Sequence, residues 1–202
     1  MNILMITPSF PNIGNTTEGL FNEQQANAMV QLGHDVTVVV CKPWIPNTIA
    51  NLCRKYNFLV HIPQSEKRGD ISIYYARYLH IPKYHWPSFT IRFCSQAVIL
   101  ALRNVGIKRS FDIMQVHSIW PTGLAAPLIS KTILCPYILT MHIQDDSRLF
   151  ERRNLELYYK MLKKACAIVA VGRPLLGSLT KFNDLEPNKI SIIPNGIDLG
   201  II

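Results

Sequence analysis

The stretch Asn2-Ile3-Leu4-Met5-Ile6-Thr7 decides the fold class, because everything after it repeats the same alternation. A continuous apolar run of this length is typical of a strand buried on both faces of a parallel sheet. A loop with two prolines follows over 8–15, and then a predicted helix over 19–32 that Gly33 ends. A valine-rich strand is predicted next, over 36–41. This order predicts a right-handed crossover between two parallel strands.

The alternation continues to the end of the chain. Further strands are predicted at 71–78, 112–116, 137–141, 167–171 and 189–193, and further helices at 89–105, 122–131, 150–164 and 174–182. Residues 42–70 show mixed periodicity, and no element is assigned there. The whole pattern predicts an α/β fold: a Rossmann-like, doubly wound, mostly parallel sheet with helices on both faces.

Two of the predicted helices show an apolar face. In the first helix we expect Thr16 or Thr17 to act as the cap, and the buried face to consist of Phe21, Ala28, Met29 and Leu32. In the helix at 150–164, basic residues surround a face made of Leu155, Tyr158, Met161, Leu162 and, just beyond it, Ala165. Both faces are expected to pack on the sheet.

The net charge of +8 is concentrated in the middle of the chain. Residues 42–109 contain eleven Lys and Arg, and their acidic residues are Glu66 and Asp70, so this region accounts for the whole excess. Two interpretations stay open: a solvated basic face, or a surface that attracts anionic lipid or a phosphate-bearing acceptor. No segment matches an RNA- or DNA-binding module, so nucleic acid is not an expected partner.

The sequence also bears on location. No apolar run approaches the roughly 18 residues of a spanning helix. The start of the chain lacks the basic segment and small-residue cleavage site of a signal peptide. We therefore expect a cytoplasmic protein, with the basic region as a possible contact to the inner face of the membrane. Five widely spaced cysteines without a Cys-x-x-Cys pair disfavour a disulfide framework or a zinc site.

Ligands of open parallel sheets bind at the carboxyl ends of the strands. The first such loop carries Gly14, Asn15 and Gly19 just before a helix, whose free N–H groups suit a phosphate or a sugar hydroxyl. A dinucleotide-binding loop would need Gly-x-Gly-x-x-Gly at this position. The sequence has a longer loop with prolines, which disfavours nicotinamide or flavin binding.

Four segments, in this order, resemble family 4 glycosyltransferases of the GT-B fold. Members of that family typically read Leu-x-x-x-Gly-His-Glu-Val-Thr-Val, Asp-Val-Val-His-Ala-His, Val-Val-Thr-x-His-Gly-x-Asp and Ile-Pro-Asn-Gly-Val-Asp. The corresponding segments here lie at 31–38, 112–123, 137–145 and 193–198, and the last reads Ile193-Pro194-Asn195-Gly196-Ile197-Asp198. The resemblance covers the whole chain.

The resemblance implies a function and a domain boundary. It implies a retaining, hexosyl-type transferase that moves a sugar from a nucleotide-sugar donor to a hydroxyl acceptor, without a metal or another cofactor. The family's commonest setting is the synthesis of cell-envelope polysaccharide or glycolipid. Residues 1–194 would form the N-terminal, acceptor-side domain, and 195–202 would begin the linker to a C-terminal donor-binding domain that this chain lacks. The chain alone is therefore expected to be inactive.

The resemblance also implies roles for individual residues. His142 would face the transferred sugar as the catalytic-site residue, and Asp145 matches the trailing aspartate of the same motif. His117 would line the acceptor cleft, while Gln115 replaces the first histidine of its motif. The loop with Gly14, Asn15 and Gly19 would close over the donor diphosphate and the acceptor; which glycine approaches the ligand stays open. The alternative interpretation is a non-catalytic Rossmann-like domain that binds a small ligand or a partner.

Overall fold

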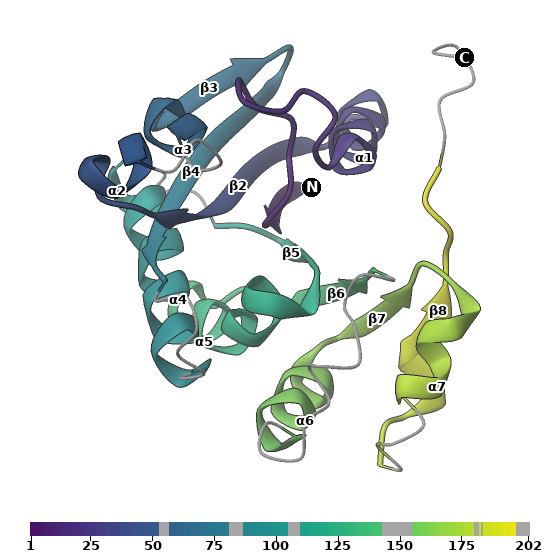
Figure 1. The fold of residues 1–202 in the computed structure, drawn as a ribbon. Coiled ribbons are helices and arrows are strands. Elements are labelled where there is room, and N and C mark those ends of the chain that lie inside the picture. The colour runs from purple at the N-terminus through teal and green to yellow at the C-terminus, as the bar shows by residue number, and fades with distance from the viewer. Residues whose placement is uncertain are drawn as a thin grey trace.

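The computed structural model describes residues 1–52, 57–80, 87–104, 110–142, 155–179, 182 and 184–196. Within these residues eight strands form one sheet in the order β3-β4-β2-β1-β5-β6-β7-β8 (Figure 1). The strands are β1 (Asn2–Thr7), β2 (Asp35–Trp44), β3 (Ser65–Arg68), β4 (Ile71–Leu79), β5 (Ile113–His117), β6 (Tyr137–Met141), β7 (Ala167–Ala170) and β8 (Ile190–Ile192). Each neighbouring pair is parallel except β3 and β4, which confirms the predicted doubly wound sheet.

Helices connect the strands. They are α1 (Leu20–Gln31), α2 (Asn47–Leu52), α3 (Asn57–His61), α4 (Pro87–Asn104), α5 (Leu124–Ile133), α6 (Leu155–Lys164) and α7 (Leu176–Leu179). Three shorter turns are a π-helical turn, η2 (Ile119–Gly123), and two 3₁₀ turns, η5 (Arg173–Leu175) and η6 (Pro187–Lys189). The predicted helix at 150–164 is seen from Leu155 onward; 150–154 lie outside the described residues.

Apolar residues of the central strands are buried on both faces of the sheet. Along β1, Leu4 and Ile6 join one core cluster while Ile3 and Met5 join the other. Helices α4, α5 and α6 cover the first face, and α1 and α3 cover the second (Figure 1). This two-sided burial is the reason that the β1 sequence is continuously apolar rather than alternating.

The segment without an assigned element, 42–70, contains regular structure. Strand β2 continues to Trp44, the short helices α2 and α3 follow, and β3 pairs antiparallel with β4 at the sheet edge. The sequence of β3 is Ser-Glu-Lys-Arg, and none of its residues is buried. Charged residues protect an exposed edge from pairing with other chains, but they remove the apolar pattern by which a strand is recognised.

The predicted cap of the first helix and part of its predicted face are wrong, although Met29 packs against the core as expected and Phe21 is half-buried. Gly19, in the left-handed conformation (φ 66°), is the N-cap of α1, and no side chain caps it. The residues of α1 that are buried are Asn22 and Ala26, whereas Leu32 is 75% exposed. By contrast, the predicted face of α6 is confirmed, because Tyr158, Met161, Leu162 and Ala165 are buried and Leu155 packs against the same cluster.

None of the helices in the described part of the chain is both long and apolar enough to cross a membrane. The predicted linker lies largely outside the described residues, which end at Gly196.

Candidate functional site

A row of buried polar side chains lies at the carboxyl edge of four adjacent strands. Lys42 lies near the end of β2, Thr7 ends β1, His117 ends β5, and Thr140 and His142 lie at the end of β6. Each of them is at most 7% exposed. Burial of polar groups is costly unless they are paired, so polar side chains gathered at one edge indicate a site rather than ordinary core.

His117 and His142 form the centre of this row. Their facing nitrogens, Nδ1 of His117 and Nε2 of His142, are 3.1 Å apart, and the rings stack with centroids 5.4 Å apart. The ring of Phe21, in the first turn of α1, also contacts His142, at a centroid distance of 4.8 Å. The imidazole of His142 is therefore in contact with both an aromatic ring and a second imidazole.

Burial keeps both histidines neutral. It lowers the pKa of His117 to about 3, with a smaller effect from the neighbouring His142, and it lowers the pKa of His142 to about 4. A neutral imidazole can donate one hydrogen bond and accept another, as a sugar hydroxyl also can. The pair therefore suits a polar, uncharged group better than it suits acid catalysis by an imidazolium.

This burial predicts acid sensitivity. Histidines of the unfolded chain protonate near pH 6.5, well above the native pKa values, so the unfolded state binds more protons between these values and stability falls as pH falls. We expect a loss on the order of 1 kcal/mol per histidine for each pH unit below about 6.5. The measurement is urea unfolding from pH 7.5 to pH 5.5.

The double variant His117→Gln/His142→Gln should show a flatter pH profile than the wild type. The variant His61→Gln, which removes an exposed imidazole from α3, serves as the control and should keep the wild-type slope. An equal slope in the double variant and the wild type would assign the acid sensitivity to other groups.

The turn after β5 holds His117 in place. Ser118 adopts a positive φ of 66°, and its N–H donates to the carbonyl of Thr140 on the neighbouring strand at 2.9 Å. The hydroxyl of Thr122 donates to the carbonyl of His117 at 2.5 Å, and the N–H of Gly123 donates to the carbonyl of Ser118 at 3.0 Å. The end of β5 is thereby tied to both β6 and the start of α5.

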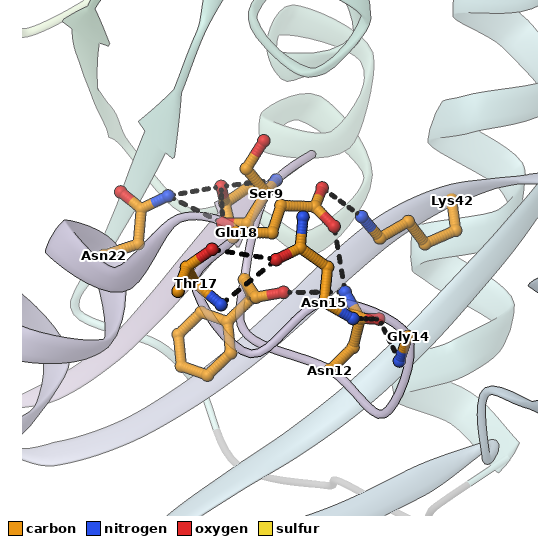
Figure 2. Close-up of polar contacts among 10 residues, drawn as sticks. Ser9, Asn12, Gly14, Asn15, Thr17, Glu18, Asn22 and Lys42 are labelled. Atoms are coloured by element: carbon orange, nitrogen blue, oxygen red, sulfur yellow. Dashed lines mark hydrogen bonds and ion pairs between the residues drawn. The ribbon is translucent and has the colours of Figure 1, made fainter. Parts of the chain in front are cut away.

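The first loop is organised by Asn12, which is 1% exposed. Its amide nitrogen donates to the carbonyl of Phe10 at 3.1 Å and to Glu18 Oε2 at 2.9 Å, and its Oδ1 accepts the N–H groups of Gly14 and Asn15 (Figure 2). The N–H groups of Gly14 and Asn15, which could otherwise donate to a phosphate, are thus already paired within the loop.

Asn22 joins the first loop to β1. Its amide nitrogen donates to Thr7 Oγ1 at 2.9 Å and to the carbonyl of Ser9 at 2.7 Å (Figure 2). Its Oδ1 is buried without a partner among the described residues, as are Nε2 of His117 and Oγ1 of Thr140. Buried polar atoms are nearly always paired in native proteins, so three such atoms around this edge indicate that it receives a polar ligand or ordered water.

The two glycines of the first loop make different contacts. A Cβ on Gly19 would lie 2.3 Å from the carbonyl oxygen of Ser9, and a Cβ on Gly14 would lie 2.5 Å from the side chain of Phe58 in α3. Gly14 and Asn15 are exposed at the tip of the loop, while Gly19 is buried. Packing within the protein is therefore sufficient to explain both glycines.

The structure brings some of the predicted site residues together and separates others. His117 and His142 meet directly, and α1 reaches them through Phe21, two residues after Gly19. The tip of the first loop does not approach the histidine pair in this way. Gly14 packs against Phe58 of α3, and Glu18 contacts Lys42 near the end of β2. Asp145 lies outside the described residues.

Sequence reasoning missed six polar residues of the site: Thr7, Asn12, Glu18, Asn22, Lys42 and Thr140. No local signal marked Asn22, because an asparagine in the first turn of a helix, beside Glu23, is expected to face solvent. The Glu18–Lys42 contact joins residues 24 positions apart, and no local pattern marks it.

The described part of the chain contains no group of three His, Cys, Asp or Glu side chains close enough to hold a metal ion. The basic region is not one uniform face. Lys42 pairs with Glu18, Arg68 pairs with Glu23 and Glu66, and Arg77 donates to the carbonyl of Ile62. The basic side chains of this region that are exposed without such a contact are those of Lys67, Arg92 and Arg103. Its other basic residues, Arg54, Lys55, Lys83, Lys108 and Arg109, lie outside the described residues.

Comparison with protein families finds a match to the model of Glycosyltransferase Family 4 over residues 21–200. Among curated proteins, the putative teichuronic acid biosynthesis glycosyltransferase TuaC of Bacillus subtilis is 27% identical over 202 residues. The match covers 98% of this chain and 50% of TuaC, so the chain spans about half the length of this relative.

Solved structures show the same fold. Sucrose-phosphate synthase from Thermosynechococcus elongatus matches with a TM-score of 0.65 at 14% identity, over 100% of this chain and 50% of that protein. The catalytic domain of starch synthase IV from Arabidopsis thaliana, bound to ADP and acarbose, matches with a TM-score of 0.61 at 13% identity, over 99% and 52%.

Proposed function

Because the chain belongs to glycosyltransferase family 4, we propose that it is the acceptor-side half of a retaining enzyme that transfers a hexose from a nucleotide sugar to a hydroxyl acceptor. A cell-envelope polysaccharide or glycolipid is the proposed acceptor. The role for which TuaC is named, teichuronic acid biosynthesis, supports a polysaccharide. The chain spans half of TuaC, and the proposed donor-binding residues belong to the other half.

The observation that carries this proposal is the neutral histidine pair at the carboxyl edge of the sheet. His142, at 7% exposure, is more accessible than His117 at 1%, and we assign to it the hydrogen bond to the transferred sugar. His117 contacts the His142 ring and is proposed to keep it in place, in addition to the predicted role in the acceptor cleft. A hydrogen bond from a fixed imidazole holds the sugar in the geometry needed for attack by the acceptor hydroxyl.

The remaining assignments are proposals of the same kind. Gly14, Asn15 and Gly19 belong to the loop that we place over the substrates, and Asp145 to the loop after β6. No metal or other cofactor is proposed, and the nucleotide sugar is a substrate.

The experiment that tests this function joins residues 1–196 to the second half of TuaC and assays the product for sugar transfer from nucleotide sugars. Transfer to a polysaccharide or lipid-linked acceptor, with retention at the anomeric carbon, is expected. The chain alone is expected to show no turnover of any nucleotide sugar, since it spans only about half the length of TuaC. Turnover by the chain alone would contradict the assignment, and binding of a sugar without transfer by the joined protein would favour a non-catalytic binding domain.

A peripheral contact with anionic membrane is the proposed setting of this half. Trp44 and Leu79 are register partners at the carboxyl ends of β2 and β4 and are 47% and 40% exposed. They lie in the same stretch of sequence as the basic excess, and basic residues near an acidic bilayer contribute about 1 kcal/mol each.

We expect the chain to co-sediment with liposomes that contain acidic lipid at low salt, and to be released at high salt. The double variant Trp44→Ser/Leu79→Ser should bind more weakly. Leu134→Ser removes an exposed apolar side chain (87%) that precedes the amino end of β6, and it should bind as the wild type does. Failure of the wild type to co-sediment would exclude the membrane contact.

A further inference from the structure

A buried ion pair lies beside the first loop, and the proposed function does not use it. Lys42 is 5% exposed near the carboxyl end of β2, and its Nζ lies 2.5 Å from Oε1 of Glu18, just before α1. The Glu18 side chain is itself three-quarters buried. A lysine is almost never buried to this degree without a partner, so the position of Lys42 depends on the carboxylate.

The other oxygen of Glu18 extends the contact into the loop. Oε2 accepts the amide nitrogen of Asn12 at 2.9 Å, and Oδ1 of Asn12 accepts the N–H groups of Gly14 at 2.9 Å and Asn15 at 3.2 Å. A continuous chain of polar contacts therefore runs from the sheet to the tip of the loop (Figure 2).

The other contacts of this segment are mostly local. Residues 13–17 are exposed; Asn12 and Asn15 exchange two backbone hydrogen bonds, Thr17 donates to Oδ1 of Asn15, and Gly14 packs on Phe58. Among the described residues, the Lys42–Glu18–Asn12 contacts are the polar contacts that tie this local structure to the sheet. Hydrogen bonds to a charged group are stronger than those between neutral groups. One carboxylate oxygen of Glu18 contacts Lys42 on the sheet, and the other accepts from Asn12 in the loop. Without Lys42, Glu18 would leave its buried position for water, and Asn12 would lose the acceptor that orients its amide.

We propose that Lys42 and Glu18 are positioning residues for sugar transfer: they hold the first loop in the conformation that contacts substrate. The proposal rests on the proposed function, since it assumes that this loop covers the substrates. A loop that contacts substrate equally in the ground state and the transition state contributes to KM. Loss of the pair should therefore raise KM more than it lowers kcat.

The first measurement uses the chain itself and needs no activity. In the Lys42→Met variant, hydrogen exchange of the Gly14 and Asn15 amides, followed by NMR, should be about tenfold faster than in the wild type, because the loop opens more often. The Lys160→Met variant, which removes an exposed lysine paired with Glu156 on α6, is the matched control and should leave these amides unchanged. Unchanged exchange at Gly14 and Asn15 in Lys42→Met, or an equal acceleration along the whole chain, would overturn the proposal.

Two further variants protect the test against misfolding. Lys42→Arg keeps the charge and should retain slow exchange, while Glu18→Gln keeps the acceptor for Asn12 but removes the ion pair and should give a partial acceleration. Equal exchange in all three variants would contradict the positioning role.

The second measurement uses the joined two-half enzyme. Lys42→Met should raise KM for at least one substrate about tenfold with a smaller change in kcat, and Lys42→Arg should recover most of the difference. If Lys42→Met lowers the melting temperature but leaves KM and kcat unchanged, the role of Lys42 is merely structural and the proposal is overturned. If the joined wild-type enzyme transfers no sugar, the proposed function fails and the role in catalysis fails with it, whereas the exchange experiment still decides whether the pair holds the loop.

Discussion

Replacement of His142 by alanine is expected to lower kcat/KM for sugar transfer by about a hundredfold in the joined two-half enzyme. The imidazole contacts both Phe21 and His117, so the hydrogen bond that we propose from it to the sugar would have a fixed direction that no mobile side chain can replace. A displacement of a substrate by about 1 Å can cost a factor of roughly 100 in rate. The measurement is initial rates over a range of donor and acceptor concentrations.

Three variants sharpen this result. His142→Gln keeps a neutral donor and acceptor and should retain more activity than His142→Ala. His117→Gln should cause a smaller loss, because His117 is only 1% exposed and in our proposal affects the sugar through the ring of His142. His61→Ala, on the surface of α3, should leave the rates unchanged. If His142→Ala keeps kcat/KM within about threefold of wild type, the assignment of His142 is wrong.

Replacement of Gly19 by alanine is expected to lower the free energy of unfolding by about 3 kcal/mol or more. Two effects add. The residue has φ 66°, a left-handed conformation that is unfavourable for any side chain, and its Cβ would lie 2.3 Å from the backbone oxygen of Ser9. Ser9 cannot easily retreat, because its N–H and carbonyl are held by Thr7 and Asn22. Urea unfolding of the 202-residue chain measures the loss.

Gly33 provides the matched control. It also has a positive φ, 83°, but nothing lies within 4 Å of a Cβ built on it. Gly33→Ala should therefore show the conformational cost alone, about 1 kcal/mol. Similar losses in the two variants would show that the contact with Ser9 is not the cause.

The order of strands and helices could be predicted because it depends on local patterns. A strand buried on both faces is continuously apolar, and the face of α6 repeats at helical spacing, so both can be read from neighbouring residues. The face of α1 could not be read in this way. Its packing includes Asn22, whose burial depends on Thr7 and Ser9 in a different part of the chain, and the apolar Leu32 lies beyond the edge of the core.

In the candidate site, too, the positions of single residues could be predicted from local patterns, whereas the contacts between distant segments could not. His117 and His142 were predicted at strand ends from the pattern of each segment. Their contact at 3.1 Å depends on the pairing of β5 with β6, which places His117 opposite Thr140. The Glu18–Lys42 pair depends on how the first loop folds back over β2.

The sequence by itself determined the Rossmann-like class, the family resemblance and the strand ends at which the candidate site lies, since apolar periodicity and short motifs are properties of adjacent residues. Only the tertiary structure decided that two neutral histidines touch, that a buried lysine pairs with Glu18 of the first loop, and that the Ser9 backbone leaves no room for a Cβ on Gly19. These are contacts between segments distant in the chain, and they depend on sheet register and on the energetic cost of leaving a buried polar group unpaired.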